Sequence, residues 1–268
     1  MISTLHLIIL GIVQGITEFL PVSSSAHLIL VPQIMGETDQ GLMVDVGAHA
    51  GTLLAVILVF WRESLQMLRG LYDTALLRKT WNAKLAQYLI LATIPGALAG
   101  IAIVSWSETF TRHIPLIIIS NLIWASALWW ADKKCPQEKT VTEDLTWQRA
   151  LFVGLAQMLA LIPGTSRSGI TMTASRYLGF TRIEAARLSL MMSIPITAGA
   201  VLAVVGKLIE HNPGPEEIRH FIIVAAVSFI TALFAILFLL HWLKRFNFTP
   251  FVVYRFCLAA ALIVWLYF

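Results

Sequence analysis

The sequence is poor in charged residues and in cysteine, and each shortage excludes a class of protein. Only 13% of its 268 residues are charged and 58% are hydrophobic, whereas soluble domains carry about 25% charged residues. A soluble globular enzyme, a disordered chain and a coiled coil are therefore excluded. The two cysteines, Cys135 and Cys257, stand far apart, so neither a disulfide framework nor a zinc site is expected. Residues 1–10 lack the basic stretch of a cleavable signal peptide, so we expect the first apolar segment to be retained.

Long apolar runs fill most of the chain, which distinguishes it from a β-barrel with its short alternating segments. The runs cover residues 5–31, 44–61, 85–106, 114–131, 150–178, 185–205, 221–243 and 250–268. A span needs about 20 residues to cross the hydrocarbon layer. We therefore predict an all-α polytopic membrane protein, organised as a single membrane domain over residues 1–268. The net charge of +4 is explained by basic cytoplasmic loops, so no nucleic-acid partner is expected.

The first and fifth runs are each interrupted near the middle by proline and small hydroxyl residues. The first contains Glu18-Phe-Leu-Pro-Val-Ser-Ser-Ser25, and the fifth contains Leu161-Ile-Pro-Gly-Thr-Ser-Arg-Ser168. Aligning the two prolines sets Ser23 beside Thr165. Paired broken segments at matching positions indicate a midplane site built from discontinuous helices. We predict two inverted repeats, about 1–131 and 148–268, each with a re-entrant helix pair plus three transmembrane helices.

The distribution of lysine and arginine predicts the topology. If both broken segments are re-entrant, the basic loops 62–84, 132–149 and 244–245 share one side, which the positive-inside rule makes cytoplasmic. The opposite side receives Arg112, Lys207 and Arg219. The two breaks would then enter from opposite faces. If both segments spanned fully, the first two loops would still share a side. The stretch 133–144 is the best candidate for a linker between the halves.

The first break carries a candidate nucleophile, base and carboxylate. Gln14 and Glu18 are four residues apart, so they lie on one helix face. The serines Ser23, Ser24 and Ser25 would supply hydroxyls at the start of a second helix, and a helix start favours anions. His27 follows Ser24 by three residues and Ser23 by four, within reach of either hydroxyl. A serine beside a base is the minimum arrangement for a nucleophile, although serines at a helix start more often act as caps.

The second break surrounds an arginine with small and hydroxyl residues. Arg167 lies among Thr165, Ser166 and Ser168, and its fork of donors matches phosphate. We interpret this stretch as an oxyanion cradle; the alternative is a helix break whose arginine reaches the interface. A further alternative is that Glu18 and Arg167 form a structural ion pair that joins the two repeats. Glu18 could also hold Mg²⁺ or Ca²⁺ if phosphate oxygens and water completed the ligand set.

Two weaker candidates lie outside the breaks. Asp45 and His49 are four residues apart at the start of the second run, where they form either a functional pair or a helix-end pair. Arg255 lies inside the last run, and we expect it to be an interfacial anchor, with contact to substrate as the alternative.

The two motifs together resemble those of a known family. Gln14-Gly-Ile-Thr-Glu-Phe-Leu-Pro-Val-Ser-Ser-Ser-Ala-His27 and Pro163-Gly-Thr-Ser-Arg-Ser-Gly169 are similar to the two signatures of bacterial undecaprenyl-diphosphate phosphatases of the bacitracin-resistance type. The resemblance covers essentially the whole chain. It implies a multi-pass plasma (inner) membrane enzyme with inverted repeats and a site open to the periplasmic or outer side. Its substrate would be a polyprenyl diphosphate lipid, recycled to the monophosphate for peptidoglycan synthesis. A homodimer is possible, and the sequence does not decide the oligomeric state.

The same resemblance implies roles for individual residues. Glu18 would be a catalytic or metal-binding acid that uses Mg²⁺ or Ca²⁺, Ser24 a nucleophile or phosphate ligand, and His27 a proton-transfer group. Arg167 would clamp the phosphate, supported by Ser166 and Ser168. Two departures matter: Gln14 stands where the family often has glutamate, and Ala26 where it often has glycine. Because glutamine carries no charge, a mechanism with two carboxylates is in doubt.

A transporter or lipid flippase is the rival function, since broken helices in inverted repeats are common in secondary transporters. The serine, histidine and glutamate beside an arginine favour hydrolysis, because transport does not need them. A purely structural membrane subunit would leave these ionisable groups at membrane depth without a purpose.

Overall fold

The structure is a computed structural model that describes residues 3–37, 40–103, 113–210 and 213–267. Six helices in these ranges are long and apolar enough to cross a membrane, as the hydropathy pattern predicts. They are α3 (Gly41–Val59), α5 (Trp81–Ile103), α7 (Ile114–Lys134), α11 (Arg182–Glu210), α12 (Pro215–Leu243) and α13 (Thr249–Tyr267). The predicted end at 106, Arg112 and the side chain of Lys207 lie outside what is described. The described ranges are nearly all helical, and the chain is a multi-pass membrane protein.

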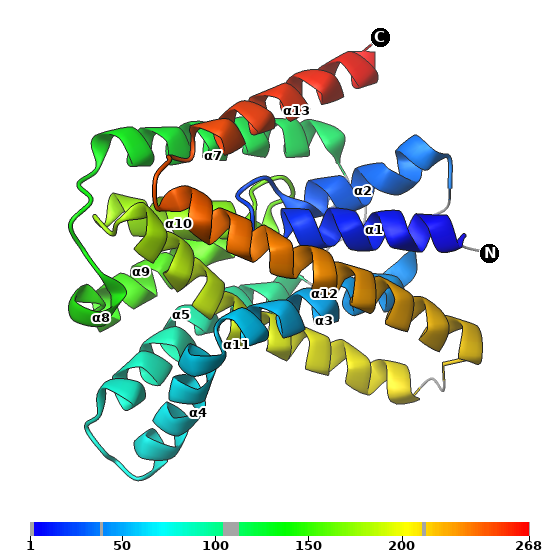
Figure 1. The fold of residues 1–268 in the computed structure, drawn as a ribbon. Helices are drawn as coiled ribbons and strands as arrows, with labels where there is room; N and C mark the ends of the chain where they lie inside the picture. The colour runs from blue at the N-terminus through cyan, green and yellow to red at the C-terminus, as the bar shows by residue number, and fades with distance from the viewer. Residues whose placement is uncertain (1–2, 38–39, 104–112, 211–212, 268) are drawn as a thin grey trace.

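The two interrupted runs are broken helices, as their prolines and serines predict. The first run forms α1 (Thr4–Thr17) and α2 (Ser24–Met35), and the second forms α9 (Trp147–Met158), the short 3-10 turn η1 (Leu159–Leu161) and α10 (Arg167–Tyr177). The longest of these helices has 14 residues, so it extends about 21 Å, short of the roughly 30 Å hydrocarbon layer. Both pairs lie in the middle of the molecule, between the long helices (Figure 1).

The order of a broken pair followed by three long apolar helices occurs in each half, with α4 as an extra helix in the first. The register differs by one residue from the proline alignment. Ser23 occupies the N-cap position of α2 and Ser166 that of α10, and both have positive φ, 77° and 71°; of the two, Ser166 alone makes a side-chain capping hydrogen bond. By position at the start of the second helix of each pair, Ser23 matches Ser166 rather than Thr165. The inverted relation of the halves stays a prediction.

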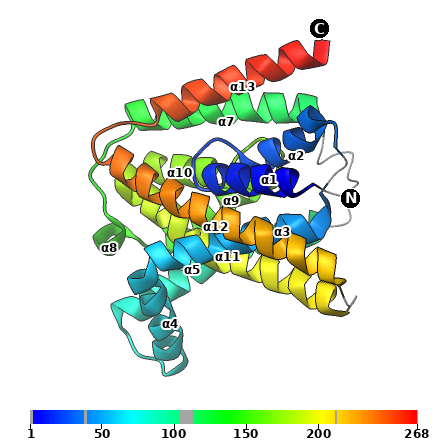
Figure 2. The same cartoon turned by 45° about the vertical axis from the view of Figure 1, so that its right-hand side comes forward.

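The halves pack against each other through closely approaching helices. Helix α12 of the second half crosses α3 and α1 of the first, and α13 lies beside α7 along one edge (Figures 1 and 2). A Cβ on Gly15 of α1 would lie 1.9 Å from the Thr231 hydroxyl of α12, and one on Gly51 of α3 would lie 2.2 Å from the Ala225 carbonyl. Small residues allow such backbone approach, which drives helix association in lipid. The breaks are thereby held between tightly packed spans.

Two predicted loops contain helices. The stretch 62–84 includes α4 (Trp61–Ala75), which packs against α5 with Gly70 directly over the Asn82 carbonyl. Its apolar residues repeat at helical spacing, and charged residues stand between them. The charged residues lower its mean hydropathy well below that of a transmembrane span. The stretch 133–144 includes α8 (Val141–Asp144), whose first N–H donates to Glu184 at 2.9 Å. The candidate linker is therefore tied to the second half.

Candidate functional site

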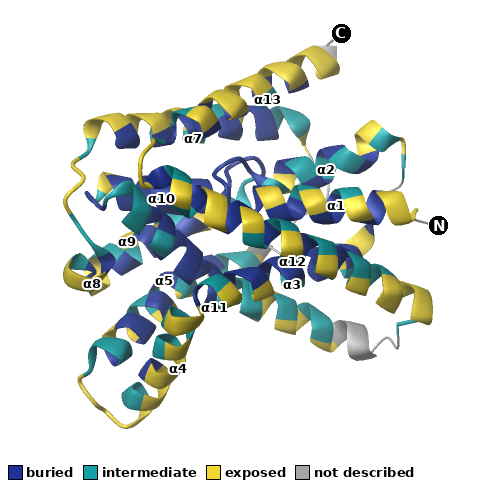
Figure 3. Ribbon diagram, in the orientation of Figure 1, coloured by how far each residue is buried: buried dark blue, intermediate teal, exposed yellow. Residues whose placement is uncertain are grey.

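The two breaks meet at the centre of the protein, where they form the dark blue, buried loops of Figure 3. Nη2 of Arg167 lies 2.6 Å from Oε1 of Glu18. The hydroxyl of Ser168 donates to the Leu20 carbonyl at 2.9 Å. One ion pair and one hydrogen bond thus join segments that are far apart in sequence, as the paired breaks predict.

Glu18 is the most connected side chain of the site. It caps the end of α1 and is 7% exposed. While Oε1 binds Arg167, Oε2 accepts hydrogen bonds from Nε2 of Gln14 at 3.0 Å and from the hydroxyl of Ser24 at 2.9 Å. Burial of a carboxylate at membrane depth is tolerated only with such partners. The carboxylate therefore accepts a hydrogen bond from the hydroxyl of the predicted nucleophile. This is how a nucleophile is paired with its base.

His27 does not pair with a serine hydroxyl, so this part of the sequence interpretation is wrong. Its Nδ1 lies 2.7 Å from the carbonyl oxygen of Ser23, and its Nε2 lies 2.6 Å from the hydroxyl of Tyr254 on α13. The hydroxyls of Ser23 and Ser25 instead lie 3.3 Å from each other. The reason is tertiary: α13 presents a hydroxyl to the imidazole, and Ser24 has turned to Glu18. The role of His27 in proton transfer stays a prediction.

The second break is built around the start of α10. Ser166 caps this helix, and its hydroxyl accepts from the Gly169 N–H at 3.1 Å and lies 3.2 Å from the Ser168 hydroxyl. Thr165 is fully buried, with no hydrogen-bond partner for its hydroxyl among the described residues. Arg167 follows as the first helical residue. Its Nη2 binds Glu18, but its Nη1 is a buried donor that has no partner in the described chain.

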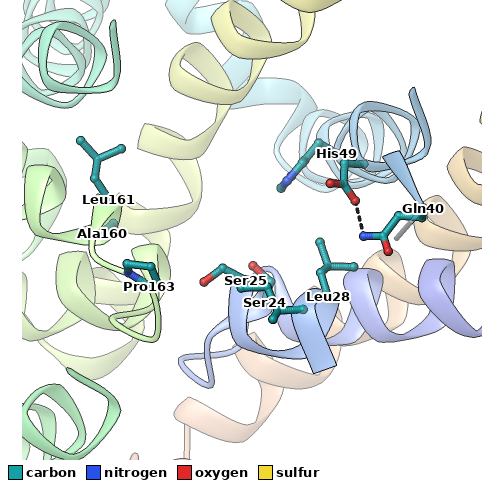
Figure 4. Close-up of a pocket in the computed structure, with 10 residues that line it drawn as sticks. Ser24, Ser25, Leu28, Gln40, His49, Ala160, Leu161 and Pro163 are labelled. Carbon is teal, nitrogen blue, oxygen red and sulfur yellow. Dashed lines mark hydrogen bonds between the residues drawn. The ribbon is translucent and has the colours of Figure 1, made fainter. Parts of the chain in front are cut away.

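A cavity of about 310 Å³ opens between the breaks and the start of α3. Ser24 and Ser25 face Leu161 and Pro163 across it, and His49 points into the same space (Figure 4). Such a volume lies at the lower end of the range for small-molecule sites. A head group held there would contact both breaks at once.

His49 belongs to this site, although sequence spacing connects it with Asp45. Its Nδ1 lies 3.0 Å from Nε2 of Gln14 and 3.8 Å from Oε2 of Glu18. Asp45, one turn earlier on the same helix, accepts a hydrogen bond from Gln40 at 2.7 Å. In the sequence, His49 stands out by its four-residue spacing from Asp45. This spacing indicates which face of the helix carries His49, but it does not indicate which residue of another helix His49 contacts.

The hydrogen-bond donors around Glu18 favour an anion. Glu18 is flanked by Arg167 on one oxygen and by His49 near the other. Ser24 and Arg167, the first residues of α2 and α10, both bind Glu18, and helix N-termini carry partial positive charge. A single carboxylate cannot accept from all of these donors, so some are available to a phosphate. The first of them is Nη1 of Arg167, which has no partner in the described chain.

An acidic residue beyond the far end of α2 ties the first helix pair together, outside the spans. Glu37, which follows α2, accepts from the Ser3 hydroxyl at 2.9 Å and pairs with Nδ1 of His6 at 2.5 Å. These hydrogen bonds, that of His6 above all, hold the pKa of the Glu37 carboxyl below its usual value. The two open ends of α1 and α2 are therefore fastened on one side while the break joins them on the other.

Fold and site together define a polytopic membrane protein with a charge-paired polar centre between two helix breaks. The chain matches the family model described as "Bacitracin resistance protein BacA" over residues 7–261, and it belongs to that family. It is also 44% identical over 264 residues to a protein named undecaprenyl-diphosphatase from Aliivibrio salmonicida (strain LFI1238), with 96% of each chain covered.

Proposed function

We propose that this protein is an integral-membrane phosphatase that hydrolyses undecaprenyl diphosphate to undecaprenyl phosphate and phosphate. The observation that carries the proposal is the junction of the breaks, where Arg167 binds one oxygen of Glu18 and the Ser24 hydroxyl binds the other. Family membership and the name of the Aliivibrio relative support the same activity. The reaction would return a lipid carrier to cell-wall synthesis, consistent with the bacitracin resistance in the family's description.

The geometry suggests how the residues divide the work. Phosphoryl transfer is catalysed mainly by positioning and by neutralising charge on phosphate oxygens. Nη1 of Arg167, which has no partner in the described chain, and the N–H groups at the start of α10 would hold the terminal phosphate. Thr165, Ser166 and Ser168 would support this clamp, and Gln14, Ser23 and Ser25 would line the opposite wall.

Ser24 and Glu18 offer the nucleophilic step. The Ser24 oxygen would attack the terminal phosphorus, its proton would pass to Oε2 of Glu18, and the bond to the bridging oxygen would break to release undecaprenyl phosphate. Water would then cleave the phosphoserine and regenerate Ser24. Direct attack by a water that Glu18 deprotonates is the alternative; it needs Glu18 in the same place and forms no phosphoserine.

A divalent cation fits this site only when it is shared with the substrate. The described chain contains no group of three or more His, Cys, Asp or Glu side chains that could hold a metal ion. Oε2 of Glu18 and the buried Oε1 of Gln14, which has no partner in the described chain, are the oxygens on offer. Mg²⁺ usually binds through one or two carboxylates plus substrate phosphates. When bound, it would neutralise charge on the diphosphate.

The predicted topology gives the site its side of the membrane. Basic residues in loops 62–84, 132–149 and 244–245 favour a cytoplasmic location for those loops. In a bacterial inner membrane, the substrate would then reach the cavity from the periplasmic or outer side and from within the lipid. A homodimer is compatible with this arrangement.

Phosphate release from undecaprenyl diphosphate by purified protein in detergent, with Mg²⁺ or Ca²⁺, tests the proposal. We expect release by the wild-type chain and none by Arg167→Ala. Because detergent micelles hold no gradient, release also separates a hydrolase from a flippase or transporter. Lipid movement across vesicles by a wild-type protein that releases no phosphate would overturn the assignment.

A further inference from the structure

Two adjacent residues of α13 contact the two breaks. The hydroxyl of Tyr254 lies 2.6 Å from Nε2 of His27, three residues after Ser24 in the first break. Nη2 of Arg255 donates to the carbonyls of Gly164 and Thr165 in the second break, at 2.9 and 3.0 Å. Successive residues of a helix point in directions about 100° apart, so one dipeptide can reach both sides of the site.

Arg255 is fully buried, so the prediction of an interfacial anchor is wrong. Its Nε donates to Oδ1 of Asn121 on α7 at 2.6 Å, and Nδ2 of Asn121 donates back to the Arg255 carbonyl at 2.9 Å. Hydropathy could not indicate this because the partner is a single asparagine on a distant helix. The described residues provide no carboxylate partner for this guanidinium, so backbone and amide oxygens alone hold its charge.

The carbonyls that Arg255 holds immediately precede the phosphate clamp. Gly164 has a φ of 85°, and a Cβ there would lie 2.5 Å from the Ile117 carbonyl. The Ser120 hydroxyl also donates to the Pro163 carbonyl. The second break is thus pressed against α7 and fastened by Arg255. The position of Thr165 in turn sets where Ser166 and Arg167 begin α10.

Tyr254 holds the first break in a corresponding way. Its ring lies nearly parallel to the His27 ring, with centroids 5.7 Å apart and planes at 12°, so the two rings meet at their edges through the hydroxyl contact. The other imidazole nitrogen binds the Ser23 carbonyl, next to Ser24. Through His27, the phenol therefore fixes the backbone from which the Ser24 hydroxyl projects.

We infer that the Tyr254-Arg255 dipeptide is a positioning element that sets the spacing between the two breaks, so that Ser24 and Arg167 reach the same phosphate. The inference rests on the proposed phosphatase function. Neither residue is assigned a chemical step: Arg255 acts through Thr165 and Arg167, and Tyr254 acts through His27. Both should affect turnover without contact with the substrate.

Arg255→Lys is the sharpest test, because lysine keeps the charge but cannot bind Asn121 and two carbonyls at once. We expect kcat to fall by at least about tenfold, with KM for undecaprenyl diphosphate raised as the clamp loses its place. Arg245→Lys, at an exposed arginine before α13, is the matched control and should keep wild-type kinetics. Tyr254→Phe should lower kcat by about fivefold with little change in KM. Its control is Tyr72→Phe on the exposed face of α4, which should keep wild-type kinetics.

A second readout measures the position of the break without using activity. Thr165→Cys in a Cys135→Ser, Cys257→Ser background places a thiol at a fully buried position. A water-soluble methanethiosulfonate reagent should label it slowly, and at least about fivefold faster when Arg255→Lys is added, because the loosened break exposes the thiol. If Arg255→Lys fails to fold, Asn121→Ala replaces it, with the same expected direction.

The outcomes separate the inference from the function on which it rests. A wild-type chain without phosphate release would refute the phosphatase, while thiol labelling would still decide whether Arg255 holds the break. Unchanged labelling together with wild-type kinetics in Arg255→Lys and Tyr254→Phe would overturn the positioning role. Faster labelling with reduced kcat would support it.

Discussion

Oε1 of Glu18 and Nη2 of Arg167 lie 2.6 Å apart although 149 residues separate them in the sequence. This ion pair joins the ends of two broken helices, and its carboxylate also binds the hydroxyl of Ser24, which lines the cavity. The two side chains are not equally occupied, since both oxygens of Glu18 accept hydrogen bonds whereas Nη1 of Arg167 has no partner among the described residues. The pair can therefore serve the architecture and still receive a phosphate.

Removing either member of this pair should abolish phosphate release. Arg167→Ala also leaves a buried carboxylate without its ion-pair partner. Breaking a fully buried pair costs at least about 3 kcal/mol. Because Arg167 is 17% exposed, we expect this variant to lose up to about that amount of stability. The double variant Glu18→Gln, Arg167→Gln should recover most of the melting temperature without recovering activity. Near-normal turnover in purified Arg167→Ala would refute the site assignment.

Ser24→Ala should lower kcat by at least about a thousandfold if serine is the nucleophile, because the covalent route is then lost. Rapid quench of the wild-type enzyme with substrate labelled in the terminal phosphate should yield a labelled phosphoserine. Ser126→Ala, which removes an exposed hydroxyl of α7 bonded only to the Leu122 carbonyl, is the control. A Ser24→Ala enzyme that loses less than tenfold would favour direct attack by water.

Gln14→Glu should make the protein more responsive to divalent cations. The new carboxylate would lie about 3 Å from Oε2 of Glu18, the distance now spanned by the Gln14 amide, and two like charges there repel each other without a cation. We expect a lower melting temperature in EDTA than for the wild type, and a larger rise when Mg²⁺ or Ca²⁺ is added, because binding to the folded state stabilises it. Equal melting temperatures in EDTA and Mg²⁺ would argue against a cation at this position.

The Glu37 carboxylate should make stability depend on pH in the acidic range. Because its pKa is lower in the folded protein than the usual 4.5, its contribution is present above pH 4.5 and is lost as the pH falls through the folded pKa. Glu37→Gln should flatten this part of the curve of melting temperature against pH. Glu216→Gln, at an exposed surface pair with Arg219, is the control and should leave the curve close to that of the wild type.

The sequence predicts the spans and the breaks well because both depend on local composition. Apolar runs define α3, α5, α7, α11, α12 and α13 to within a few residues, except for the longer ends of α11 and α12. Pro21 and Pro163, with the serines that follow, mark where each broken helix must restart. The meeting of Glu18 and Arg167 also follows, since buried charges need partners.

The partners of individual side chains could not be predicted in the same way. Helical spacing connects His27 with Ser24 and His49 with Asp45, whereas the structure gives these histidines to Tyr254 and to Gln14. Spacing fixes the face of a helix, but the neighbour on that face comes from packing between distant segments. Arg255 was misjudged for the same reason, because only α7 and the second break together can bury it.

The backbone at Ser23 and Ser166 has a wider consequence. Both residues have a positive φ, which costs an L-residue with a side chain about 1–2 kcal/mol more than it costs glycine. Glycine at either position would relax the chain but delete a hydroxyl from the polar centre. Thermal robustness and hydrolytic competence are therefore expected to oppose each other at these two caps, so variants chosen only for resistance to heat should drift away from activity there.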